Sequence, residues 1–326
     1  MKKDFSKTPR KFIKKAKQRV VSADEYDFSD ILKKATVLKV NSNYNLLVEI
    51  DGYKQDAIVA GRIKNLVFKE KNPIAVGYKV LVDTSPQVNR VVKILSAKNK
   101  LQRITNGIPT VIAANLDNVF IVCSYKMPQT KFSLIDRYLT YCKINGINSI
   151  ICINKMDFFE KDEVFLEKMK FYQDLGIETI FISAKNGDNI DRLKNLLYGK
   201  ISIFTGQSGV GKSSIINKID KNLNIKTGKV SLYNKRGVHT TSAVRMYPFS
   251  FSGYLVDSAG IKTFALSKDD LVEIARNFPG FKKHRCKFNN CIHINQTGCK
   301  VEEAVAKGKY PYQRYFSYKG IINEIT

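Results

Sequence analysis

Hydrophobic residues alternate with polar ones in short runs over the first third of this 326-residue chain. β-branched residues are frequent in these runs, and Asp51-Gly52 and Val76-Gly77 separate them with turn residues. Short runs bounded by turn residues predict strands joined as hairpins. Five such strands predict a small barrel of the oligonucleotide-binding (OB) fold over residues 35–100, with a generic all-β domain as the alternative. The predicted strands are 36–40, 45–50, 56–60, 79–82 and 90–95.

From residue 103 to 265 the pattern changes to apolar strands that alternate with longer helical segments. This alternation predicts an α/β domain built on a parallel sheet. Polar motifs follow these strands, at the carboxyl ends where such sheets bind their ligands. The remaining segment, 266–326, is predicted to be a mainly helical, metal-binding module. The predicted strands are 118–123, 149–154 and 179–183, and the predicted helices are 134–145 and 159–175.

Neither a membrane span nor a secretory signal is evident in the sequence. The most apolar stretch, 111–124, is interrupted by polar residues and is too short to cross a bilayer. The basic segment 1–20 lacks the apolar core of a signal peptide. Cys123, Cys142 and Cys152 stand singly in apolar surroundings, as buried reduced thiols do. We therefore expect a cytoplasmic protein without a membrane partner.

The charge of the chain favours a polyanionic partner. Lys and Arg number 55 against 29 Asp and Glu, which gives a net charge of +26. Such an excess creates a field that attracts nucleic acid and, less specifically, anionic membranes. Residues 1–34 form a basic extension that we interpret either as an RNA contact or as a solvated helix face. Basic residues among the predicted barrel strands, such as Lys54, Arg62 and Lys64, also favour RNA.

Residues 206–213 match the phosphate-loop pattern G-x-x-x-x-G-K-[ST]. An apolar strand, 201–204, precedes the loop and a predicted helix, 214–218, follows it, which makes a chance glycine-rich turn a poor explanation. Glycines let the backbone curl so that N–H groups and the helix N-terminus face a phosphate. Lys212 should reach the β- and γ-phosphates, and the Ser213 hydroxyl should bind Mg²⁺. The predicted contacts are Gly206, Gln207, Ser208, Gly209, Val210, Gly211, Lys212, Ser213 and Ser214.

Two polar motifs follow the second and third strands of the parallel sheet and indicate which base is bound. The Asp157 carboxylate can accept both the N1 and N2 hydrogens of guanine, whereas adenine offers no matching pair of donors. Asn154 can bridge to the phosphate loop, the Lys155 stem can cover a base face, and the Ala184 N–H can donate to guanine O6. The motifs are Asn154-Lys155-Met156-Asp157 and Ser183-Ala184-Lys185.

Two further loops are expected near the γ-phosphate. Asp257 ends a short apolar run and should bind Mg²⁺ through water, while the Gly260 N–H should sense the γ-phosphate. In the loop 235–242, one threonine should close on Mg²⁺ in the triphosphate state. The sequence does not choose between Thr240 and Thr241.

The residue after Gly260 is Ile261, at a position where Ras-like enzymes carry a glutamine that orients water. An apolar side chain cannot do this, so another group or a partner must. His239 is the nearest polar candidate, with a loop or RNA-contact role as the alternative. We therefore expect slow intrinsic hydrolysis that a partner stimulates.

Near the C-terminus, three cysteines and a histidine share one short segment: Cys286, Cys291, His293 and Cys299. Three thiolates and one imidazole fill all four positions of a tetrahedral site, which is typical of one structural Zn²⁺. His284 is a competing ligand.

Basic and aromatic residues accompany this cluster. Lys282, Lys283, Arg285 and Lys287 indicate that the metal-binding segment also contacts phosphate. The segment 310–318 mixes aromatic residues with cations. It is interpreted either as a surface that stacks on RNA or as a helix that packs on the zinc module.

The order of the motifs is unusual, because the base-reading motifs precede the phosphate loop. Together with the barrel and the Cys-x4-Cys-x-His-x5-Cys segment, this order resembles the circularly permuted GTPases called RsgA or YjeQ, from residue 35 to the end of the chain. Two departures from the family are visible. Val238 stands where the family usually has arginine, and residues 257–260 read Asp-Ser-Ala-Gly in place of Asp-Thr-Pro-Gly.

The resemblance implies a late assembly factor of the small ribosomal subunit. The barrel and the zinc module would hold ribosomal RNA, and GTP hydrolysis to GDP, with Mg²⁺ and stimulated by the subunit, would drive release. We expect a monomer divided into segments 1–34, 35–100, 103–265 and 266–326. Two alternatives are an RNA-binding scaffold whose nucleotide only stabilises the fold, and a GTPase that acts on another RNA such as tRNA.

Overall fold

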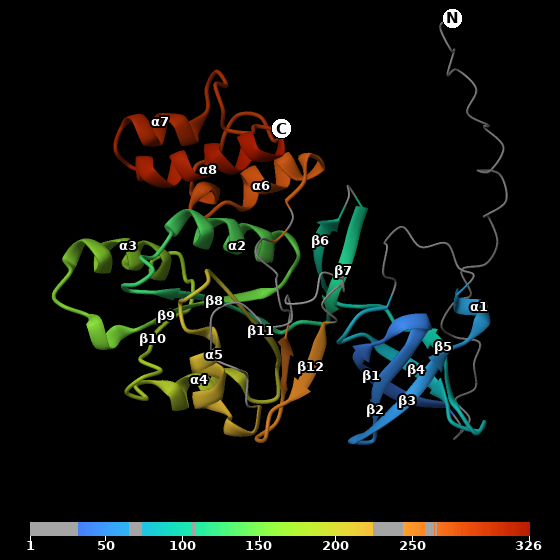
Figure 1. The fold of residues 1–326 in the computed structure, drawn as a ribbon. Coiled ribbons are helices and arrows are strands. Elements are labelled where there is room, and N and C mark those ends of the chain that lie inside the picture. Colours follow the sequence, from blue (N-terminus) through green and yellow to red (C-terminus); the bar gives the residue numbers. More distant parts are fainter. Residues whose placement is uncertain (1–31, 65–73, 106–107, 224–243, 258–263, 265) are drawn as a thin grey trace, which may run out of the picture.

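The computed structural model describes residues 32–64, 74–105, 108–223, 244–257, 264 and 266–326 (Figure 1). Nearly all of the predicted basic extension, up to residue 31, lies outside the described residues. In the described part of the chain, no helix combines the length and apolarity needed to cross a membrane.

Five strands of the described residues close into the predicted barrel. Their order is β1-β2-β3-β5-β4, and β4 pairs back with β1 to close the circuit. Val37, Val48, Val80 and Val91, from four of these strands, are fully buried in its interior. The closed barrel predicted from the sequence is thus confirmed. The elements are β1 (Leu32–Val40), β2 (Asn45–Ile50), β3 (Tyr53–Val59), β4 (Lys79–Asp83), β5 (Asn89–Ile94) and the short α1 (Gly61–Lys64).

The predicted parallel sheet lies beside the barrel. Its described strands run in the order β10-β9-β8-β11-β13, all parallel, with β12 antiparallel at the end. β8 is buried at every position, which explains its continuous apolar sequence. The strands are β8 (Asn118–Ser124), β9 (Asn148–Asn154), β10 (Thr179–Phe181), β11 (Ile201–Thr205), β12 (Arg245–Pro248) and β13 (Tyr254–Asp257).

Helices cover both faces of the parallel sheet (Figure 1). Because side chains alternate along a strand, Val119, Ile121 and Cys123 of β8 pack on one face, and Phe120 and Val122 pack on the other. Helices α2 and α3 cover the first face, and α4 and α5 the second. The helices are α2 (Phe132–Ile144), α3 (Glu163–Gln173), α4 (Ile190–Leu197) and α5 (Lys212–Ile219).

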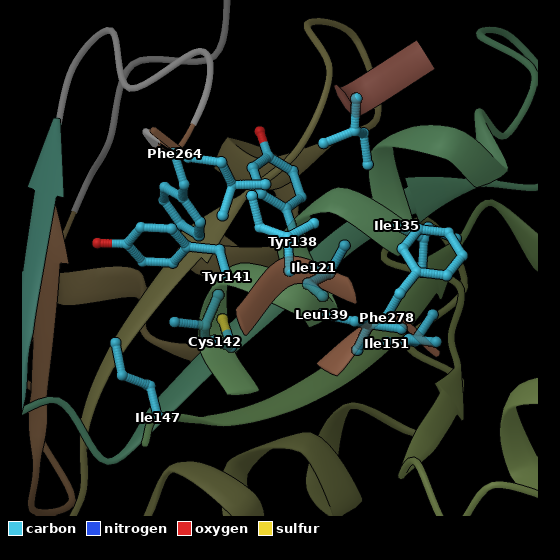
Figure 2. Packing of buried hydrophobic residues seen from close by; sticks show 14 of the residues in the cluster. Ile121, Ile135, Tyr138, Leu139, Tyr141, Cys142, Ile147, Ile151, Phe264 and Phe278 are labelled. Carbon is cyan, nitrogen blue, oxygen red and sulfur yellow. The ribbon is translucent and has the colours of Figure 1, made fainter. Parts of the chain in front are cut away.

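The C-terminal helices sit on the outer side of α2 (Figure 1). Figure 2 shows the shared core, in which Phe264 packs against Tyr138 and Tyr141 of α2 with ring centroids 4.7 and 4.9 Å away. Tyr315 and Tyr318 are buried in this core, so the terminal aromatic segment forms a packed helix, the second of the two predicted alternatives. The helices are α6 (Leu271–Asn277), α7 (Lys300–Ala306) and α8 (Tyr312–Ile325).

The barrel is joined directly to the parallel sheet, which the sequence pattern did not predict. β1 pairs with β12 at Lys39 and Arg245. The neighbouring Leu38 is buried in the core of the parallel sheet and not in the barrel. The Tyr254 hydroxyl of β13 donates a hydrogen bond to Glu49 of β2. The two sheets therefore share backbone pairing, apolar packing and a side-chain hydrogen bond.

The structure also differs from the sequence prediction in two elements. A hairpin of β6 (Lys100–Thr105) and β7 (Ile108–Ala114) stands between the barrel and β8, and the Gln102 N–H donates to the Tyr141 hydroxyl at 2.8 Å. The helix predicted from residue 159 begins only at Glu163. The reason is that the Asp162 side chain accepts the Phe165 N–H at 2.9 Å and caps α3 there.

Candidate nucleotide site and metal centre

The phosphate loop leaves β11 and enters α5, in the strand–loop–helix context that the sequence predicted. Gly206, Gly209 and Gly211 have φ angles of 143°, 82° and 94°, a region that residues with a Cβ rarely adopt. A Cβ at Gly206 would overlap the carbonyl oxygen of Val122, and one at Gly211 would overlap the Asn154 side chain. The backbone conformation therefore favours glycine at all three positions, and the available space also requires it at Gly206 and Gly211.

Lys212 lies where this loop enters helix α5. Its Nζ donates to the carbonyl oxygens of Gly206 at 2.8 Å and Gln207 at 2.6 Å. Burial lowers the pKa of Lys212, and a phosphate placed beside it would favour the charged ammonium and oppose that shift. Ser213 and Ser214 follow in the first turn of α5, the first half-buried and the second exposed.

Asn154, at the end of β9, connects the phosphate loop with the base-reading motifs. Its Nδ2 donates to the Val210 carbonyl at 2.9 Å, and its Oδ1 accepts the Ala184 N–H at 3.0 Å. The side chain is 2% exposed, so these hydrogen bonds are shielded from water. The Ala184 N–H, predicted to donate to guanine O6, donates to Asn154 in this structure.

Asp157 is held close to the second base-reading motif. Its Oδ1 accepts a hydrogen bond from Ser183 Oγ at 2.8 Å, and Lys185 Nζ lies 3.9 Å from Oδ2. The Asp157 side chain is 9% exposed. The carboxylate is thus oriented by its neighbours, as a group that reads a base edge needs to be.

Lys155 contacts a loop that the sequence did not single out. Its backbone is left-handed, with φ of 64°, and its Nζ donates to the carbonyl oxygens of Gly209 and Met127. Met127 lies in the loop between β8 and α2. This loop could have been predicted from the topology. β8 is a central parallel strand, and the loop that follows such a strand lies at the ligand-binding edge of the sheet.

Asp257 ends β13, beside the strand that leads into the phosphate loop. It lies opposite Arg245 of β12. Burial raises the pKa of Asp257, and the Arg245 charge opposes this. A bound divalent cation would act in the same direction as Arg245. The other residues predicted near the γ-phosphate, His239, Thr240, Thr241 and Gly260, lie outside the described residues.

The four predicted metal ligands converge, with ligand atoms all within 4.8 Å of one another. His293 Nδ1 lies 3.5, 3.3 and 3.4 Å from the sulfurs of Cys286, Cys291 and Cys299, and Cys286 Sγ lies 3.9 Å from Cys299 Sγ. Zinc bonds of about 2.3 Å to sulfur and about 2.0 Å to nitrogen place tetrahedral ligands about 3.5 to 3.8 Å apart. The cluster therefore fits Zn²⁺, and His284 is not part of it.

Two tyrosines of helix α8 hydrogen-bond to the backbone of the segment that carries this cluster. The Tyr315 hydroxyl donates to the His293 carbonyl at 2.8 Å, and the Tyr318 hydroxyl donates to the Ile292 carbonyl. Burial lowers the pKa of His293, which favours the neutral imidazole that binds metal. Helix α8 thus fixes the backbone that carries His293.

Comparison with known proteins identifies the family. Residues 94–267 match the family model described as RsgA GTPase, a range that includes every predicted nucleotide-binding residue. The small ribosomal subunit biogenesis GTPase RsgA of Flavobacterium psychrophilum is 33% identical over 88% of this chain and 91% of its own length. This chain belongs to the RsgA GTPase family. As a member of that family it is a GTP hydrolase.

Other relatives agree with this assignment. The protein of the same name from Haemophilus influenzae is 41% identical over 66% of this chain and 63% of its own length. The crystal structure of YjeQ from Thermotoga maritima superposes with a TM-score of 0.73 at 30% identity, covering 90% of this chain and 98% of that one. YloQ, described as a circularly permuted GTPase, matches in fold with a TM-score of 0.68 at 23% identity, over 92% of this chain and 97% of its own. The permuted fold is thus confirmed.

Proposed function

We propose that this RsgA-family GTPase assists maturation of the small ribosomal subunit, binding its ribosomal RNA with GTP and leaving after hydrolysis to GDP. The names of its relatives and the net charge of +26 support this role. The observation that carries the nucleotide part is the Asn154 side chain, which hydrogen-bonds to the phosphate loop and to the base-reading loop at once. One buried residue thereby links two sequence motifs into a single site.

In this proposal each motif has a separate task. Asp157 reads the guanine edge and the Lys155 stem covers the base. Lys212 neutralises the β- and γ-phosphates, while Ser213 and Asp257 hold Mg²⁺, which supplies charge stabilisation at the phosphates. The threonine ligand, Thr240 or Thr241, and the γ-phosphate sensor Gly260 complete the site.

Hydrolysis is proposed to depend on the subunit. Ile261 cannot orient water, so His239, placed by the bound subunit, is proposed to do so. The other attributes are proposed together: one structural Zn²⁺ held by the Cys286 cluster, a monomeric chain, and a cytoplasmic location where subunits assemble.

The test combines sedimentation with kinetics. Purified small subunits are sedimented with the full chain and a non-hydrolysable GTP analogue or GDP, and GTP turnover is measured with and without subunits. We expect co-sedimentation with the analogue, less with GDP, and turnover raised at least about tenfold, which corresponds to about 1.4 kcal/mol of barrier. Lys212→Ala serves as the control that loses both effects.

The same experiment separates the alternatives. Equal binding of GTP and GDP states with no stimulation would favour the scaffold. Stimulation by tRNA, without association with subunits, would favour action on another RNA.

A further inference from the structure

A cavity of about 370 Å³ lies at the metal-binding segment. Because the ligand atoms are within 4.8 Å of one another and Zn–S bonds are about 2.3 Å long, a metal ion bound there would occupy only a small part of it. The cavity is therefore larger than metal binding requires. Its lining residues are Cys286, Phe288, Asn290, Cys291, Gln296, Thr297, Gly298 and Cys299.

The walls combine one flat apolar ring with small polar groups. Phe288 is 58% exposed, which is high for a large apolar side chain, and Lys287 Nζ lies 5.6 Å from its ring centroid. Gln296 Oε1 accepts the Ile292 N–H at 2.8 Å, so its amide nitrogen is the end that remains to donate. Asn290 and Thr297 are exposed on the same cavity. An aromatic face beside amide and hydroxyl groups is the composition that binds an unpaired nucleobase.

The segment 282–287, called here the cationic segment, is positively charged; it includes Cys286 and directly precedes Phe288, both of which line the cavity. Lys282, Lys283, Arg285 and Lys287 are exposed, and within the described residues none of them forms an ion pair. No acidic residue occurs between Glu273 and Glu302 in the sequence. These cations are available to the phosphates on either side of a bound base.

The nearest acids are already engaged. Glu302 accepts hydrogen bonds from the Asn295 and Gln296 N–H groups, and its Oε1 lies 2.9 Å from the Tyr315 hydroxyl. Glu303 pairs with Lys300 and Lys307. Glu303 is therefore neutralised by two lysines, and Glu302 is engaged by backbone N–H donors.

The cavity walls are held by backbone contacts. The Cys291 N–H donates to the Phe288 carbonyl at 3.3 Å, and the Cys299 N–H donates to the Gln296 carbonyl at 3.1 Å. Bound zinc would fix both cysteines further. A site that is ordered before binding loses less conformational entropy when its ligand binds.

We propose that this cavity, the base pocket, binds one unpaired nucleobase of an RNA strand. Phe288 stacks on the base, Asn290, Gln296 and Thr297 contact its edge, and the cationic segment holds the adjacent phosphates. The inference rests on the proposed function, because the RNA would be that of the bound subunit.

The test uses the zinc-loaded full chain and fluorescein-labelled 12-nucleotide RNAs, as four single-stranded homopolymers and one mixed-sequence duplex. Phe288→Ala should weaken single-strand binding by on the order of tenfold, the loss of one stacked base, and leave duplex binding unchanged. Phe288→Tyr should retain binding. Phe316→Ala is the matched control, since this α8 side chain is 63% exposed and lies outside the pocket.

The base pocket is overturned if the wild-type chain binds no single-stranded RNA. It is equally overturned if Phe288→Ala, with zinc content intact, binds like wild type, or if Phe316→Ala loses as much affinity. Subunit-stimulated GTP turnover of the wild type is measured in parallel. Absent stimulation with a Phe288-dependent RNA affinity would reject the proposed function and leave the pocket standing.

Discussion

Single side chains in the nucleotide site serve two motifs at once. Asn154 joins the phosphate loop to Ala184, and Lys155 joins it to the loop after β8. Asp157 is oriented by Ser183. Substitution at any of these positions should therefore weaken the contacts of the protein with more than one part of the nucleotide.

Asp157→Asn should shift the base preference from guanine to xanthine. The substitution replaces an acceptor by a donor, which no longer matches the guanine N1 and N2 hydrogens but matches the carbonyl that xanthine carries instead. Losing a hydrogen bond to a charged group costs about 1.5–3 kcal/mol, so GTP affinity should fall roughly 10- to 100-fold. Competition between GTP and XTP for a fluorescent nucleotide measures this. Unchanged GTP selectivity would show that Asp157 does not recognise the base.

Cys291→Ser should release zinc and loosen the C-terminal module, because serine lacks the thiolate that completes the tetrahedron. Metal analysis should fall from about one zinc per chain, and hydrogen exchange should rise in α7 and α8. Cys142→Ala is the control, since Cys142 is buried on α2 outside the cluster. A stable, fully loaded Cys291→Ser chain would contradict the ligand set.

At the scale of elements, α8 is fastened to α2 and α3 by a buried ion pair. Arg314 Nη1 lies 2.9 and 3.0 Å from the two Asp136 oxygens, and the Tyr172 hydroxyl donates to Asp136 at 2.8 Å. The guanidinium also lies 5.0 Å from the Phe132 ring centroid. Burial raises the pKa of Asp136 and the Arg314 charge opposes this. The C-terminal module is thus attached to the GTPase domain through a buried ion pair.

Arg314→Ala should destabilise the chain by about 3–5 kcal/mol, because it leaves the Asp136 carboxylate buried without its partner. Urea unfolding with zinc present measures the loss. Without Arg314 the folded-state pKa of Asp136 lies further above its unfolded value, so this variant should lose stability as pH rises above about 4.

Glu324→Ala provides the comparison for Arg314→Ala. Glu324 pairs with Arg137 in the same helix interface; the Arg137 side chain is 11% exposed, but the Glu324 side chain is 60% exposed. Because water can reach the cation once Glu324 is removed, this substitution should cost less than Arg314→Ala, on the order of 1 kcal/mol. Equal effects of the two substitutions would show that the Arg314 pair contributes nothing beyond an exposed one.

At the scale of the whole molecule, the permutation attaches both flanking modules near the γ-phosphate loops. The C-terminal module follows Asp257 and its loop in the chain, and the barrel contacts β12, which lies between the predicted threonine loop and Asp257. Because β12 pairs with both β1 and β13, a shift of the Asp257 strand would move the barrel. We therefore expect nucleotide state to change the orientation of the barrel.

Spin labels at Tyr53→Cys on the barrel and Tyr198→Cys after α4, both exposed positions, should show different distances with GTP analogue and with GDP. Adding Tyr254→Phe, which removes the hydrogen bond to Glu49, should broaden both distributions. Identical distances and RNA affinities with the GTP analogue and with GDP would contradict this hypothesis.

The sequence predicted elements best where their pattern was local. The five barrel runs and the strands β8, β9 and β11 were found, because β-branched and apolar runs report burial directly. β12, Arg245-Met246-Tyr247-Pro248, was missed, since a run of four residues that ends in proline is too short to show an alternating pattern. The β6–β7 hairpin was missed because its residues read as the end of the barrel and the beginning of the apolar stretch before β8.

The sequence by itself determined which chemical groups are available: the glycine-rich phosphate loop, the carboxylate proposed to read guanine, the thiolate–imidazole set and the order of these motifs. Apart from the order of the motifs, these are short-range features, since each depends on a few neighbouring residues. The tertiary structure decided which groups are partners. Arg314 and Asp136 are 178 positions apart, and Asn154 and Val210 are 56 apart. No local pattern selects such pairs, because folding brings them together by burying the surfaces on which they lie.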